Sequence, residues 1–235
     1  MNFASGRRDV VLDDTLCDIL KKVQAVIFDL DGTLTDSIGT ILACTHKTFE
    51  IEGLPQPTDE TIMGTIGKEL SEGITSMLPQ DKKSLVKEIT AHYREIFINT
   101  PEFVVDRIFP GCEDLMKALR EHGIKIGYAS GRSRTGMLRT LDATFLGDYC
   151  DALASGNESP SKPDPQMMYK VCDRLGVDPK DTLGVGDAQL DILMFKNAKA
   201  FSLGVQSGVF SGDALLNLKP DAILPYASML KDYLK

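Results

Sequence analysis

The chain contains several short segments that are apolar at almost every position. The clearest is Ala25-Val26-Ile27-Phe28, which is apolar at odd and even positions alike. Because successive side chains of a strand point to opposite faces, this pattern is typical of a strand covered on both faces, as in a parallel sheet. Five such strands are predicted, at 25–28, 124–129, 152–154, 182–185 and 200–205.

The segments between the later strands have apolar positions at helical spacing instead of continuous runs. Helices are predicted at 113–122, 134–141, 165–175 and 190–197. A short strand at 222–224 and a closing helix at 228–234 are expected to complete the sheet edge. This alternation of strands and helices predicts the α/β class, with a doubly wound parallel sheet between two helical layers.

One long stretch between the first two strands breaks the alternation. From about residue 37 to residue 107 there is no convincing strand, and apolar residues such as Ile41, Cys44, Leu70 and Ile74 recur at helical spacing. A helical insertion is therefore expected, joined to the rest through hinges near 35–36 and 100–108. The predicted organisation is an N-terminal helical extension (1–23), a core domain (24–36 and 106–235) and a helical cap domain (37–105).

The N-terminal extension carries one apolar helical stripe. Leu12, Leu16, Ile19, Leu20 and Val23 fall at i, i+4, i+7, i+8 and i+11. We expect this helix to pack on the body of the protein, with a dimer contact as the alternative. The oligomeric state is accordingly left as monomer or homodimer.

Composition and charge exclude several classes of protein. The 235 residues are 43% hydrophobic and 26% charged, which excludes disorder as the main state. Net charge is −8 without any basic block, so no nucleic-acid partner is expected. No apolar run reaches the ~20 residues of a membrane span, so no membrane association and a cytoplasmic location are expected. The five cysteines are dispersed and suggest neither a zinc site nor a disulfide framework.

Polar residues that could take part in catalysis or ligand binding lie just past the ends of the predicted strands. They are Asp29, Asp31, Ser130, Lys162, Asp187 and Asp191. Ligands of open α/β sheets bind at the carboxyl ends of the strands, so these side chains should converge. Carboxylates brought this close repel one another unless a cation lies among them, and Mg²⁺ suits an all-oxygen site that also takes a phosphate.

These residue types suit phosphoryl transfer. With a cation present, Asp29 can act as a carboxylate nucleophile that forms an aspartyl-phosphate. Asp31 can then act as general acid and general base. Ser130 and the backbone N–H of Gly131 can hold a phosphate oxygen, and Lys162 supplies a fixed positive charge.

The same residues carry a family resemblance. Asp29-Leu30-Asp31-Gly32-Thr33 resembles the first motif of the haloacid dehalogenase superfamily, Ser130 its second, Lys162 its third, and Gly186-Asp187 with Asp191 its fourth. The resemblance runs from about residue 23 to the C-terminus. It implies a Rossmann-like core, a helical cap of the first type and Mg²⁺ dependence. It also implies that the metal ligands are the Asp29 carboxylate, the Asp31 carbonyl and Asp187, with Asp191 in a supporting or ligating position.

Other activities of the superfamily fit less well. Its dehalogenases and phosphonate-cleaving enzymes lack the acid that Asp31 provides, although Lys47 and Lys68 are candidates for the cap lysine of the latter. Its sugar-phosphate mutases carry a cap histidine where this chain has Ile41. The resemblance therefore implies a phosphatase that acts on a small phosphorylated metabolite, most similar to the phosphoglycolate phosphatase group. A mutase and a catalytically silent binding protein remain alternatives.

Substrate recognition is less well defined by the sequence. Met63 to Leu70 resembles the loop by which such caps touch the leaving group, and Lys68 within it would favour an acidic group. Arg132, two residues after Ser130, is a further candidate for contact with the substrate. A solvent-exposed position is the alternative for both residues.

Overall fold

The structure is a computed structural model that describes residues 13–103, 107–209 and 212–234. Its centre is a six-stranded sheet in the order β3-β2-β1-β4-β5-β6, and every neighbouring pair is parallel. The strands are β1 (Ala25–Phe28), β2 (Lys125–Ser130), β3 (Ala152–Ser155), β4 (Thr182–Gly186), β5 (Phe201–Val205) and β6 (Ala222–Leu224). The five strands predicted from apolar runs and the short strand predicted at 222–224 are all present, so the predicted α/β class is confirmed.

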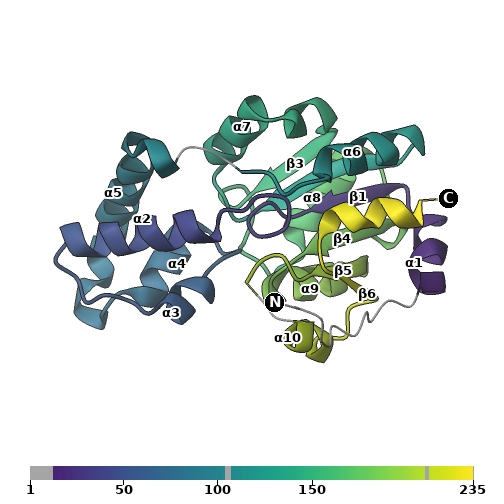
Figure 1. The fold of residues 1–235 in the computed structure, drawn as a ribbon. Helices are drawn as coiled ribbons and strands as arrows, with labels where there is room; N and C mark the ends of the chain where they lie inside the picture. Colours follow the sequence, from purple (N-terminus) through teal and green to yellow (C-terminus); the bar gives the residue numbers. More distant parts are fainter. Residues whose placement is uncertain (1–12, 104–106, 210–211, 235) are drawn as a thin grey trace, which may run out of the picture.

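Helices cover both faces of this sheet, as Figure 1 shows. They are α6 (Cys112–Glu121), α7 (Arg134–Ala143), α8 (Gln166–Leu175), α9 (Gln189–Asn197) and α10 (Gly212–Asn217). The alternation along β1 explains the two layers. Val26 and Phe28 lie in one buried cluster with residues of α6 and α7, whereas Ala25 and Ile27 lie in another with residues of α8 and α9. A strand buried on both faces must be apolar at every position.

The N-terminal helix α1 (Asp13–Leu20) packs on the body of the protein. Leu16, Ile19, Leu20 and Val23 are buried in the same cluster as α6. The apolar stripe is therefore covered within the chain, as expected. Leu12 and the remainder of the predicted extension, residues 1–11, lie outside the described residues, and the choice between monomer and homodimer stays a prediction.

The stretch between β1 and α6 is helical and lies to one side of the sheet (Figure 1). It contains α2 (Ile38–Ile51), α3 (Asp59–Met63), α4 (Leu70–Met77), α5 (Val86–Asn99) and the short 3₁₀ helices Gln80–Leu85 and Pro101–Phe103. These helices share a buried cluster of their own, which includes Phe49, Ile74 and Ile89. The proposed division into a core and a cap at residues 37–105 stays a prediction, and part of its second boundary, 104–106, lies outside the described residues.

The predicted closing helix is present, one residue earlier at each end. The segment forms a 3₁₀ helix, Ala227–Tyr233, and a helix of unspecified type was expected at 228–234. Its first residue is preceded by Tyr226, whose side chain makes no capping hydrogen bond. Ala227 and Leu230 are buried against the cluster that holds α6. For such a short, uncapped segment, this anchoring outweighs the small gain from α-helical hydrogen bonds.

Candidate active site

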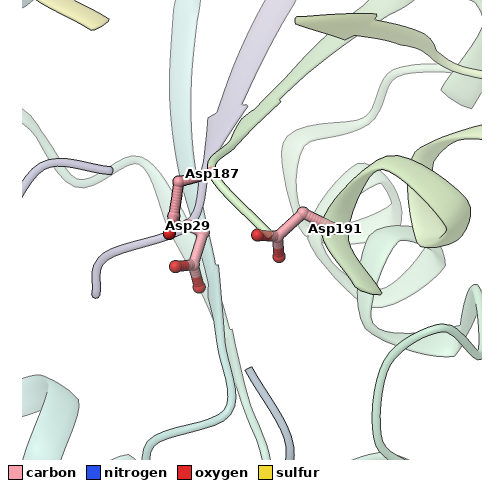
Figure 2. A group of neighbouring side chains, drawn as sticks. All are labelled: Asp29, Asp187 and Asp191. Atoms are coloured by element: carbon pink, nitrogen blue, oxygen red, sulfur yellow. The ribbon is translucent and has the colours of Figure 1, made fainter. Parts of the chain in front are cut away.

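The predicted acids meet at the carboxyl edge of the sheet because β2, β1 and β4 are adjacent and parallel. Asp29 follows β1 directly, Ser130 is the last residue of β2, and Asp187 follows β4 directly. Asp191 comes from the first turn of α9 and points toward the other two acids (Figure 2). Oxygen atoms of Asp29, Asp187 and Asp191 all lie within 4.8 Å of one another.

Two glycines make room for this cluster, because they have no Cβ atom. A Cβ atom at Gly208 would lie 1.9 Å from an oxygen of Asp187, and one at Gly32 would lie 2.5 Å from the same oxygen. Gly32 also has φ of +78°, a left-handed conformation that side chains disfavour. The loops after β1 and β5 can therefore close around Asp187 only with glycine at these positions.

Lys162, from the segment between β3 and α8, lies at the centre of the acids. Its Nζ atom is 2.6 Å from Oδ1 of Asp29 and 2.7 Å from Oδ1 of Asp191, and its side chain is fully buried. Burial alone would lower the pKa of Lys162, but the carboxylates of Asp191 and Asp29 outweigh it and raise that pKa. Lys162 therefore remains a cation wherever the protein is folded near neutral pH.

The positive charge of Lys162 does not balance the negative charges of the three acids. Burial raises the pKa of Asp29 well above its usual value, and the negative charges of Asp191 and Asp187 add to the effect against the attraction of Lys162. Burial and the charge of Asp191 likewise raise the pKa of Asp187 to about 7. A buried all-oxygen cluster with excess negative charge fits a hard divalent cation such as Mg²⁺.

The orientation of Asp187 is fixed by two partners that the sequence did not single out. The Thr33 hydroxyl donates to its Oδ1 atom at 2.9 Å, and the backbone N–H of Val209 donates to its Oδ2 atom at 2.8 Å. Thr33 was visible within the first motif, where a hydroxyl two residues after Asp31 could have been read as a partner for an acid. Val209 contributes only its backbone, so its side chain gave no signal.

Asp31 has an arginine partner. The Nε atom of Arg132 lies 3.0 Å from both oxygens of Asp31, its Nη2 atom lies 2.6 Å from Oδ1, and the Ser37 hydroxyl also donates to Oδ1 at 2.6 Å. Burial opposes ionisation of Asp31, but the charge and hydrogen bonds of Arg132 outweigh it and lower the pKa of Asp31. Arg132 was a candidate for contact with the substrate, with a solvent-exposed position as the alternative, and its contact with Asp31 was not foreseen.

The loop before α4 rests directly on the phosphate-binding candidates. A Cβ atom at Gly131 would lie 2.4 Å from the carbonyl oxygen of Lys68 and 2.7 Å from that of Gly67. The backbone N–H of Glu69 donates to the Ser161 hydroxyl at 3.0 Å, next to Lys162. Ser130 is buried, and its hydroxyl accepts from the backbone N–H of Arg132 at 3.3 Å. The insertion is therefore in contact with the core at the site itself.

A cavity of about 590 Å³ opens beside this contact. Its walls include Asp31, Gly131 and Arg132 from the core side, and Lys68 and Ile41 from the insertion. Lys47 does not line this cavity, and its Nζ atom lies 5.8 Å from the centre of the Phe103 ring. All predicted core residues thus converge at one edge of the sheet, while Lys68 and Arg132 border the adjoining space.

The chain is similar to named relatives over most of its length. It is 29% identical to the phosphoglycolate phosphatase of Nitrosospira multiformis over 209 residues, which cover 86% of this chain and 92% of that protein. It is 30% identical over 200 residues to PpaX of Clostridium perfringens, a protein named as a candidate pyrophosphatase, with 85% of this chain and 91% of that protein covered. Among the described residues, no helix has the length and apolar character needed to cross a membrane.

Solved structures share the fold. The crystal structure of a candidate haloacid dehalogenase-like hydrolase from Bacteroides fragilis is 27% identical, with a TM-score of 0.78 over 89% of this chain and 100% of that one. The β-phosphoglucomutase of Clostridium difficile is 23% identical, with a TM-score of 0.73 over 88% of this chain and 93% of that one, and shares the fold. Residues 26–205 match the family model of haloacid dehalogenase-like hydrolases, and the chain therefore belongs to that family of enzymes.

Proposed function

We propose that this protein is an Mg²⁺-dependent phosphatase that hydrolyses a small phosphorylated metabolite through an aspartyl-phosphate, as its similarity to phosphoglycolate phosphatases suggests. The observation that carries the proposal is the double contact of the buried Lys162 ammonium with Asp29 and Asp191, beside Asp187. A fixed cation next to a buried carboxylate offers a phosphoryl group one positive and one nucleophilic partner in a dry site.

In the first step, the carboxylate of Asp29 attacks phosphorus, an O–P bond forms, and the bond from phosphorus to the alcohol oxygen breaks. Asp31 donates a proton to that oxygen, so the alcohol leaves neutral. In the second step, Asp31 takes a proton from water as the water attacks phosphorus, and inorganic phosphate leaves with Asp29 regenerated. Arg132 favours the ionised form of Asp31, which is the form that acts as a base in the second step. In the first step Asp31 must carry a proton, so Arg132 must move away from it.

The other residues hold the transferred group. Lys162, the Ser130 hydroxyl and the Gly131 N–H would bind phosphoryl oxygens, and Asp191 would keep Lys162 in position. The Asp29 carboxylate, the Asp31 carbonyl and Asp187 would hold Mg²⁺. When bound, that ion supplies positive charge to the phosphoryl oxygens and offsets the repulsion between these acids.

The mutase alternative is less well supported. Ile41, which stands where the superfamily's mutases carry a cap histidine, lines the cavity and has no group to move a proton. A silent binding protein is disfavoured because Asp29, Asp31, Lys162 and Asp187 are all present and adjoin one another. Of the two lysines considered for the phosphonate-cleaving reaction, Lys68 lines the cavity and Lys47 does not, and the presence of Asp31 argues against that chemistry.

The test is phosphate release by the purified full chain from 2-phosphoglycolate and 4-nitrophenyl phosphate, with Mg²⁺ and with a chelator. Release is expected only with the ion, and Asp29→Asn should lower kcat by at least ~1000-fold. Asp142→Asn, an exposed acid outside the site, is the matched control and should keep the wild-type rate. Conversion of β-glucose 1-phosphate to its 6-phosphate without phosphate release would favour the mutase, and inactivity on every ester would favour the binding protein.

A further inference from the structure

The cavity next to the acids has an apolar side that the proposed chemistry does not require. On the insertion it is lined by Ile41, Leu70, Met77, Tyr93, Phe97 and Phe103. Its volume of about 590 Å³ is that of sites for ligands much larger than a two-carbon acid. A compact substrate would leave this apolar wall in contact with water, and the binding energy available from burying it would be lost.

Aromatic rings form a continuous part of this wall. The Phe97 ring lies between those of Tyr93 and Phe103, with centroid distances of 6.4 Å and 6.3 Å. These distances are within the range for aromatic pairs, which prefer offset or tilted arrangements. Aromatic rings therefore make up part of the apolar wall, and a ring-containing ligand can pack on them.

Arg139, a cation without a carboxylate partner in the described part of the chain, packs against the same wall. The guanidinium carbon of Arg139 lies 4.7 Å from the centroid of Phe97, and its buried Nε atom has no hydrogen-bond partner. No carboxylate in the described ranges forms an ion pair with Arg139, whereas Arg94, which also lines the cavity, contacts Glu69 at 3.5 Å. The guanidinium of Arg139 matches a planar carboxylate through two parallel hydrogen bonds.

Arg139 lies on α7, more than one turn beyond the helix start. Helix α7 begins at Arg134, close to Gly131, and Arg139 lies five residues further along. At the rise of an α-helix this places its backbone ~7.5 Å from the helix start. A ring between the phosphate and the carboxylate gives a ligand a length of this order.

Resting on the phosphatase activity proposed above, we infer that the substrates are phosphate monoesters of ring-containing, apolar alcohols with a carboxylate at the far end. The ring packs on Phe97 and its aromatic neighbours, and the carboxylate binds Arg139. The phosphate then lies at Lys162 and Ser130, so both ends of the substrate are held while Asp29 attacks.

The test compares kcat/KM of the full chain with Mg²⁺ for 4-(carboxymethyl)phenyl phosphate, phenyl phosphate and 2-phosphoglycolate. The first two have leaving groups of similar acidity, so their ratio reports recognition of the carboxylate. We expect the carboxylated aryl ester to exceed phenyl phosphate by at least ~10-fold, the value of one charge-assisted contact. Both aryl esters should exceed 2-phosphoglycolate.

Substitutions test whether Arg139 and Phe97 cause the preference for the carboxylated aryl ester. Arg139→Met should lower the ratio of the two aryl esters about tenfold, Arg139→Lys should restore part of it, and Arg134→Met, an exposed arginine of the same helix outside the cavity lining, should leave it unchanged. Phe97→Leu should lower kcat/KM for both aryl esters relative to 2-phosphoglycolate. Calorimetric binding of 4-hydroxyphenylacetate, the product alcohol, should weaken in Arg139→Met, which gives a readout independent of turnover.

The outcomes separate the two proposals. A preference for 2-phosphoglycolate, or an unchanged ratio in Arg139→Met with the variant folded, would overturn the inference and leave the phosphatase proposal standing. Absence of phosphate release from all three esters would instead count against the phosphatase activity, and the inference would fall with it.

Discussion

The guanidinium of Arg132 donates hydrogen bonds to both oxygens of Asp31, with Nε 3.0 Å from each and Nη2 2.6 Å from Oδ1. The two residues are 101 positions apart in the sequence and meet because β1 and β2 are neighbours. Since this contact lowers the pKa of Asp31, it favours the ionised form of the proposed acid/base residue for as long as Arg132 stays bound to it.

Loss of the Arg132 contact should shift the pH profile of kcat/KM. In Arg132→Met the pKa of Asp31 rises, because the charge and hydrogen bonds that lower it are lost while burial remains. The limb of the kcat/KM profile that Asp31 controls should therefore shift to higher pH, and Arg132→Lys, which keeps the charge, should shift it less. An identical profile for all three proteins would show that the contact does not persist in the working enzyme.

The fold was predictable because each strand is buried on both faces, and burial on both faces leaves an unmistakable apolar run. The closing helix was predicted without its type, since its apolar spacing fits both an α-helix and the 3₁₀ helix Ala227–Tyr233 that forms. Which of the two forms depends on caps and packing partners that lie elsewhere in the chain.

The site was predictable only in part. Asp29, Ser130 and Asp187 could be placed because strand ends of a parallel sheet share one edge. Side-chain pairing within the loops could not be read from the sequence, because it depends on rotamers and loop paths, and so the contact of Arg132 with Asp31 was missed. Arg139 was also missed, since its partner ring, Phe97, comes from a separate helix of the insertion.

Asp187→Asn should weaken the response to Mg²⁺. The amide keeps the shape of the side chain but loses the negative charge, so the apparent affinity for the ion should fall by at least ~10-fold. Ion binding stabilises the folded state by mass action, and the rise in Tm on addition of Mg²⁺ should shrink in parallel with activity. Asp142→Asn is the control, and an undiminished Mg²⁺ response in Asp187→Asn would remove Asp187 from the metal site.

Glu158 should make stability depend on pH in the acid range. Burial opposes its ionisation, but hydrogen bonds from Ser155 and Arg174 outweigh that effect and lower its pKa to about 2. A lowered folded-state pKa stabilises the protein above the ordinary glutamate pKa of 4.5, and this stabilisation is lost as pH falls toward about 2.

The variant Glu158→Gln tests this linkage. It should reduce the free energy of unfolding at neutral pH by on the order of 1 kcal/mol, because one accepting oxygen becomes an NH2 group that cannot accept from Ser155 or Arg174, and the other loses its charge. The decrease in Tm between pH 5 and pH 2.5 should be shallower than in the wild type, as thermal unfolding followed by circular dichroism can show. Parallel Tm curves for the two proteins would assign the acid sensitivity to other carboxylates.

Gly131 tests whether the insertion must close on the core for catalysis. Its φ is not in the left-handed region, so alanine is compatible with the backbone there, but the added Cβ would lie 2.4 Å from the Lys68 carbonyl oxygen. The loop before α4 must therefore retreat in Gly131→Ala while the core keeps its fold. A misplacement of about 1 Å at a reacting site costs on the order of 100-fold, so kcat/KM should fall by ~10–100-fold with little change in Tm.

Gly39→Ala is the matched control for Gly131→Ala, because Gly39 lies in α2 of the insertion with nothing within 4 Å of an added Cβ. It should preserve activity and stabilise the protein by roughly 0.5–1 kcal/mol through helix propensity. Hydrogen exchange adds a direct readout, since the Glu69 amide is protected by the Ser161 hydroxyl only while the loop is seated. Faster exchange at Glu69 in Gly131→Ala, together with the loss of kcat/KM, would tie closure to catalysis. Full activity despite faster exchange would show that the chemistry at Asp29 proceeds without the insertion in place.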